Sequence, residues 1–217
     1  LLWNQEPAVS RGVQANYSSG PLRLALSWND GFYSNTYDWL FGSIGYTIDG
    51  ANSLSLIGGG NLGRTRHTNF ATPLAQNNGE IYNLIYTHTS GPWTISPYIQ
   101  YSRVRRDAAL GIAHDASTFG AAVLASYAFD DSWKLAGRGE YIDSSATAVP
   151  GAPNLLYGQG SKAWSFTITP TYQNGIFFAR AEASYVSAAS VAPGAAFGAN
   201  GNDKSQSRIM FETGVLY

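Results

Sequence analysis

Hydrophobic and polar residues alternate along most of the chain with a period of two, the pattern of a β-strand with two different faces. The alternation is clearest in residues 207–217, where one face is apolar and ends in Tyr217, while Glu212 lies on the other. A soluble edge strand of this kind would expose unpaired backbone beside apolar side chains. The pattern therefore favours a strand paired on both sides in a closed membrane barrel, with the last strand of a soluble β-sandwich as the alternative.

The same alternation predicts eleven strands, each close to the roughly 9–11 residues that a tilted membrane strand needs. No segment keeps a helical period, and helix caps are scarce. The predicted strands are 10–17, 21–29, 37–48, 52–62, 80–89, 92–103, 117–129, 132–142, 162–173, 175–187 and 207–217.

The predicted connections alternate strictly between short and long. Short turns rich in Gly, Asp, Asn and Ser are expected at 18–20, 49–51, 90–91, 130–131 and 174–175. Long loops are expected at 30–36, 63–79, 104–116, 143–161 and 188–206. This is the pattern of an outer-membrane barrel, whose short turns face the periplasm and whose long loops face the outside.

Each predicted strand presents an apolar face for lipid and a polar face for the lumen. Trp93, Trp133 and Trp164 stand near strand starts, and Tyr101, Tyr141 and Tyr185 stand near strand ends, as expected for two interfacial aromatic belts. Pro97 and Pro170 fall on the lipid face in mid-strand, where neither can donate a hydrogen bond. We expect a local bulge at each proline.

Composition agrees with a protein whose outside is not water. Charged residues make up 12% of the chain, about half the usual share, and aromatic residues make up 14%. Mean hydropathy is nevertheless −0.15, and no apolar run is long enough for a transmembrane helix. The net charge of −1 argues against a nucleic-acid partner, and the lack of cysteine excludes disulfide and thiolate chemistry.

Three stretches resemble the OmpL-like β-barrel porins of Gram-negative bacteria. They are LLWNQEPAVSRGVQANYSSGPLRLALSWNDGFYSN, GSKAWSFTITPTYQNGIFFARAEASY and FETGVLY. The resemblance implies an outer-membrane diffusion channel without catalytic residues. Family members are usually much longer, and LLWNQE normally lies mid-chain, so we expect residues 1–217 to form one barrel domain that lacks N-terminal strands. Eleven is also an odd number, whereas single-chain bacterial barrels have an even one.

Motifs that carry catalytic or cofactor chemistry are weak in this sequence. His114 with Asp115 and Ser117 could serve a hydrolase, but no G-x-S-x-G nucleophile elbow is present. Three scattered histidines lack the spacing of metal ligands. Residues 58–63 form a Gly-rich run that no helix follows, which fails the context of a dinucleotide site. The sequence therefore predicts no catalytic, cofactor or metal site.

Five arginines are expected at the outer rim, where two strands leave the membrane. This rim set could attract anions, contact lipopolysaccharide phosphates, or simply be solvated. Asp107 and Asp115 are expected to cancel part of its field. The set is Arg64, Arg66, Arg103, Arg105 and Arg106.

A second charged set falls on the predicted lumen face. Arg138 with Glu140 and Arg180 with Glu182 are expected to form i, i+2 pairs that either tune ion passage or brace the barrel. This pore-lining set is Arg23, Lys134, Arg138, Glu140, Arg180, Glu182 and Glu212.

The sequence therefore predicts an all-β antiparallel transmembrane barrel in the bacterial outer membrane, part of a larger even-stranded barrel. Its predicted function is a porin that passively conducts small hydrophilic solutes or ions. The alternative is a non-conducting barrel that anchors an envelope or cell-surface complex, with loop 188–206 as a lumen plug or docking loop. Expected partners are outer-membrane lipid, lipopolysaccharide and solutes, with homo-oligomerisation or a second chain as ways to complete the barrel.

Overall fold

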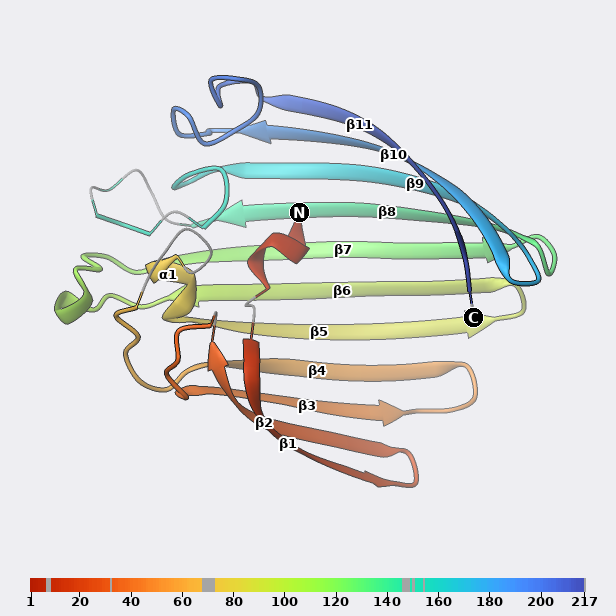
Figure 1. Ribbon diagram of the computed structural model, residues 1–217, viewed down its shortest axis with the longest axis horizontal. Coiled ribbons are helices and arrows are strands. Elements are labelled where there is room, and N and C mark those ends of the chain that lie inside the picture. The colour runs from red at the N-terminus through yellow and green to blue at the C-terminus, as the bar shows by residue number, and fades with distance from the viewer. Residues whose placement is uncertain are drawn as a thin grey trace.

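The computed structural model describes residues 1–6, 9–31, 33–67, 73–145, 149, 151–153 and 155–216. Its main feature is one antiparallel sheet of eleven strands that pair in sequential order (Figure 1). All eleven predicted strands are confirmed, within two residues at each end, although Tyr217 lies outside the described residues. The strands are β1 (Val9–Ser19), β2 (Leu22–Gly31), β3 (Trp39–Thr47), β4 (Asn52–Asn61), β5 (Gly79–Ser90), β6 (Trp93–Val104), β7 (Ala116–Ala128), β8 (Trp133–Ser144), β9 (Lys162–Asn174), β10 (Phe177–Ala189) and β11 (Ser205–Val215).

The connections lie as the sequence predicts, with all short turns at one end of the sheet and all long loops at the other (Figure 1). Gly20 and Gly91 both have a φ of 53° at the first turn position, and a proline follows each of them. Because proline cannot adopt a positive φ, these turns have the type II′ pattern, which matches the twist of a hairpin.

Among the described residues, helical structure is confined to three short segments: η1 (Leu2–Gln5), α1 (Leu74–Asn77) and η2 (Ala108–Leu110). In the described part of the chain, no helix is long and apolar enough to cross a membrane. The segment η1 lies in front of the middle strands in Figure 1, and we call the face on which it lies the inner face.

The outer face carries the two aromatic belts that the alternation predicts. Near the turns, the Trp93 and Tyr127 rings lie 4.7 Å apart, and those of Trp133 and Tyr172 lie 4.9 Å apart. Near the loops, the rings of Trp164 and Tyr185 lie 5.3 Å apart. Eight residues of strand separate the belts, about 26 Å along the strand, comparable with the roughly 25 Å apolar band of outer-membrane barrels.

The two mid-strand prolines lie on the outer face, but the expected bulges are wrong. Pro97 stays in continuous register with Val123 on β7, and Pro170 with Leu135 on β8. The ladder that is interrupted is the one to the strand on the other side, β5 for Pro97 and β10 for Pro170. The register of these two ladders does not shift across the interruption. A proline lacks one N–H, which points to one neighbouring strand, so the other ladder is unaffected. The register shift that the structure does show lies in β1, between Val9 and Gly12.

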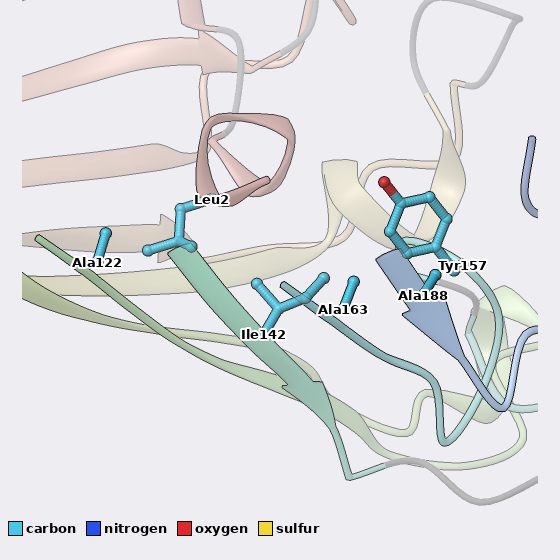
Figure 2. Close-up of a cluster of buried hydrophobic side chains, with 6 residues drawn as sticks. All are labelled: Leu2, Ala122, Ile142, Tyr157, Ala163 and Ala188. Atoms are coloured by element: carbon cyan, nitrogen blue, oxygen red, sulfur yellow. The ribbon is translucent and has the colours of Figure 1, made fainter. Parts of the chain in front are cut away.

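At the loop end, η1 and the last loop segments pack onto the inner face. Leu2 is fully buried against Ala122 and Ile142, and Tyr157 packs beside Ala188 (Figure 2). The Tyr157 and Phe197 rings, 5.2 Å apart, bring the loop after β10 into the same cluster. We call this part of the inner face the covered half, and the part nearer the short turns the open half.

The two edge strands each have one partner. In the described part of the chain, β1 pairs with β2 and β11 pairs with β10, and the sheet does not close on itself. The sheet is therefore an incomplete cylinder. Further strands or a second chain that would complete it stay a prediction.

Candidate functional site

All seven residues of the predicted pore-lining set lie on the inner face. Five of them come from β8 and β10, which flank β9, and the register aligns them in rows across the strands. Lys134 lies level with Thr171, Arg180 and Glu212, while Arg138 lies level with Thr167. The inward residues of β9 are hydroxyl-bearing along this stretch, so two charged strands flank a polar one. Arg23 is separate, six strands away on β2.

The ion pairs on β10 differ from those expected. Arg180 donates through Nε to Glu212 Oε2 at 2.6 Å, and Arg208 Nη2 lies 3.3 Å from Glu182 Oε1. The predicted Arg180–Glu182 pair is therefore wrong. Directly opposite residues on neighbouring strands lie closer together than residues i and i+2 of one strand, so the cross-strand pair prevails. Arg208 was missed, although its place on the polar face of residues 207–217 could have revealed it.

Glu140 is the best-buried charge on the wall, with 2% of its side chain exposed. Its carboxylate accepts hydrogen bonds from Ser165 Oγ at 2.7 Å and from the Leu2 amide at 3.3 Å. The backbone nitrogen of Leu1 lies 2.9 Å from the same carboxylate. Arg138 Nε lies 3.3 Å from Oε2, so the predicted Arg138–Glu140 pair is present. Glu140 thus ties η1 to the wall.

The covered half continues as a set of buried polar contacts. Gln100 donates to the Leu2 carbonyl at 3.1 Å, and Ser102 donates to the Gln5 side chain at 2.9 Å. Gln5 in turn donates to the Leu155 carbonyl at 2.9 Å. The sequence does not predict this docking, because a polar strand face indicates water and carries no signal that a chain segment lies on it.

The open half contains a hollow of about 340 Å³. Lys134 is exposed in this hollow and forms no ion pair with the described residues. Arg23, on β2 and outside the hollow, is likewise exposed and forms no ion pair with the described residues. Arg138 also borders the hollow, with 40% of its side chain exposed. The hollow is lined by Thr94, Ser96, Leu124, Ala125, Ser126, Lys134, Ala136, Gly137, Arg138, Thr167, Thr169 and Glu182.

The rim arginines lie at the loop end and are largely neutralised. Arg64 Nε lies 2.5 Å from Asp107, and Arg103 lies 3.1 Å from Asp115. The Arg64 guanidinium holds the pKa of the Asp107 carboxyl below its usual range. The backbone N–H of Arg106, together with the Arg103 guanidinium, lowers the pKa of the Asp115 carboxyl in the same way.

Arg105 forms a two-bond pair with Glu80, at 3.2 Å for each bond. Glu80 was missed as a partner because the whole β5–β6 hairpin separates it from Arg105 in the sequence. The side chains of Arg66 and Arg106 have no acidic partner in the described part of the chain. The cancellation expected from Asp107 and Asp115 is therefore present, and Glu80 extends it.

Two of the residues considered for hydrolase chemistry, Asp115 and Ser117, have other partners. Asp115 binds Arg103 and the Arg106 backbone, while Ser117 Oγ contacts Ser145 Oγ. His88, one of the three scattered histidines, places Nδ1 2.8 Å from Asn52 Oδ1 on the neighbouring strand. The described residues contain no group of His, Cys, Asp and Glu that could hold a metal ion.

Solved structures with the same fold are outer-membrane barrels. OmpT of Vibrio cholerae matches with a TM-score of 0.66 and 13% identity, over 94% of this chain and 64% of that chain. Its loop L8 deletion mutant matches with a TM-score of 0.67 and 13% identity, over 94% and 62%. The NanC porin matches with a TM-score of 0.52 and 8% identity, over 94% and 91%. This chain thus spans less than two thirds of the OmpT structures.

Sequence comparison gives the family. None of the curated protein sequences matches this chain at a significant level. The family model "Putative beta-barrel porin-2, OmpL-like" matches residues 1–217. Because the match spans the whole chain, the protein belongs to the OmpL-like β-barrel porin family and is a β-barrel protein of the bacterial outer membrane.

Proposed function

We propose that this chain forms the wall of a porin that passively conducts small hydrophilic solutes and ions. The observation that carries the proposal is the contrast between the outer and the inner face of the sheet. The outer face is apolar between two aromatic belts, whereas the open half of the inner face combines fixed charges, hydroxyl groups and a hollow of about 340 Å³. Fixed charges on a low-dielectric wall act on a passing ion more strongly than they would in bulk water.

The width of the barrel matters for this proposal. Barrels of about eight strands are filled by side chains, and those of sixteen to eighteen strands leave an aqueous channel. The eleven strands seen here form an open sheet with free edges at β1 and β11. Further strands on these edges would widen the cylinder towards the channel-forming range.

A second candidate function is a non-conducting barrel that anchors an envelope or surface complex. The covered half favours it, because η1 and Tyr157 fill the inner face at the loop end with buried side chains. If this cover extends across the completed barrel, the lumen is closed to solutes.

Electrical recording on the folded protein in planar bilayers separates the two functions. Steady ohmic openings are expected for the porin, and silence for the anchor. Thr169→Trp places a bulky ring beside the hollow and should lower the conductance. Phe166→Trp, on the lipid face of the same strand, is the matched control and should not change it. Equal conductance in both variants would place the ion path away from the open half.

We also propose that the long loops and the rim arginines face the outside of the cell, beside lipopolysaccharide. A cysteine at Arg106 should then react with a membrane-impermeant reagent on intact cells, whereas a cysteine at Asn174 in a short turn should not. Labelling at position 174 in intact cells would reverse the orientation.

A further inference from the structure

The register of the sheet surrounds one small residue of the open half with two cations and two hydroxyl groups. Ala136 on β8 pairs with Ser126 on β7 and with Thr169 on β9. Lys134 and Arg138 lie two residues before and after Ala136, and therefore on the same face. All five residues line the hollow.

This arrangement has the dimensions and groups of a small-molecule site. Four residues of strand separate the two cations, which places their Cα atoms about 13 Å apart, while the hydroxyl-bearing strands lie about 5 Å to either side. The methyl group of Ala136 leaves the centre unfilled. A volume of about 340 Å³ falls in the roughly 300–1,000 Å³ range of ligand pockets.

The charges around the hollow favour an anion. Lys134 has no carboxylate partner among the described residues, so its ammonium is available to a ligand. Glu140 is already paired with Arg138. Glu182 lines the hollow, but it lies 3.3 Å from Arg208, which largely offsets its charge. Glu182 and the hydroxyl oxygens can accept hydrogen bonds, so a ligand with its own hydroxyl donors satisfies them, whereas a bare anion does not.

We propose that the hollow around Ala136 is a binding subsite for small hydroxylated carboxylates, of the sugar-acid or hydroxy-acid class. The carboxylate binds Lys134 and the exposed part of Arg138, and the hydroxyl groups bind Ser126, Thr169 and Glu182. This inference rests on the proposed porin function, in which such a subsite raises the local concentration of one solute class along the path.

The test is NMR line broadening of gluconate titrated with the folded full chain in detergent micelles. Lys134→Gln should weaken gluconate binding by about tenfold, since a charge-assisted hydrogen bond is lost. Ala136→Leu fills the floor without changing any charge and should abolish binding. Arg23→Gln removes another unpaired inner-face cation six strands away, and it is the matched control that should keep the wild-type affinity.

Three results would overturn the subsite. The first is equal weakening in Lys134→Gln and Arg23→Gln, which would indicate general charge attraction. The second is equal binding of sorbitol, which has the hydroxyl groups without the carboxylate. The third is equal binding of propionate, which has the carboxylate without the hydroxyl groups. Binding is measured without any current, so gluconate binding in a silent barrel supports the subsite and rejects the porin, and conductance without binding does the reverse.

Discussion

The two halves of the inner face have the same sequence pattern and different environments. In the covered half, Gln100, Ser102 and Glu140 are buried and bind the backbone or side chains of η1. In the open half, Lys134 and Glu212 are exposed, and both side chains of the Arg180–Glu212 ion pair are about half exposed. Polar residues at alternate positions therefore hold a chain segment at one end of the sheet and face a hollow at the other.

The comparison shows that a charge on the inner wall is not by itself a filter. Glu140 was predicted as pore-lining beside Glu182 and Glu212, yet its carboxylate is occupied by Ser165, Leu2 and Arg138. A buried group of this kind mainly stabilises the fold, because removing it leaves several polar partners unsatisfied. An exposed pair contributes little stability and remains available to the solvent.

The largest expected effect is on stability. Glu140→Ala should lower the free energy of unfolding by about 3 kcal/mol, because it leaves the buried Leu2 N–H and Ser165 O–H donors without a partner and Arg138 without its counter-ion. Glu212→Ala is the matched control at an exposed pair, where a loss of less than about 1 kcal/mol is expected. Urea unfolding in lipid vesicles, followed by heat-resistant gel mobility, measures both. Similar losses would remove the distinction between the two halves.

The next effect concerns the docking of η1. Leu2→Ala should weaken that docking by about 2 kcal/mol or more, the usual cost of truncating a buried leucine. A cysteine at Ala122, beside Leu2 in the same buried cluster, should then become reactive to a small thiol reagent. A cysteine at Leu124, two residues along the same face in the open half, should react equally with either residue at position 2. If the cysteine at Ala122 already reacts when Leu2 is unchanged, η1 does not cover this position.

The fold was more predictable than the site, for a physical reason. A lipid-facing charge costs several kcal/mol, so every strand must alternate, and residues 92–103 or 175–187 reveal their faces without any structure. The turns are equally local, as Gly20 and Gly91 show. The docking of Leu2 against Ala122 is not local, since it joins segments more than a hundred residues apart with no periodic signal. The partner of Arg180 required the strand register, because Glu182 and Glu212 are equally plausible by sequence.

A smaller effect is expected on ion selectivity. Lys134→Gln combined with Arg23→Gln removes two unpaired inner-face cations and should shift the reversal potential towards cation preference. Arg180→Gln combined with Glu212→Gln removes an ion pair without changing the net charge and should cause little shift. The shift should shrink in 1 M salt, where the Debye length falls to about 3 Å. Unchanged reversal potentials in the first double variant at low salt would assign these cations a role outside conduction.

The smallest expected effect is a pH dependence of the covered half, carried by Glu6. Burial raises the pKa of the Glu6 carboxyl above its ordinary value of 4.5, and a hydrogen bond from Asn83 only partly opposes this. The docked state therefore favours the neutral acid. The stability that Glu6 gives to the docking is complete below pH 4.5 and is lost as the pH rises through the raised value.

Thiol labelling can detect this change. The labelling rate of a cysteine at Ala122, divided by that of a cysteine at Leu124, should increase as the pH rises from 4.5. The ratio removes the titration that both thiols share. Glu6→Gln keeps the neutral form at every pH and should flatten the profile, whereas Glu80→Gln, at the outer rim beside Arg105, should leave it unchanged. A profile that stays the same in Glu6→Gln would mean that another group, and not Glu6, makes η1 sensitive to pH.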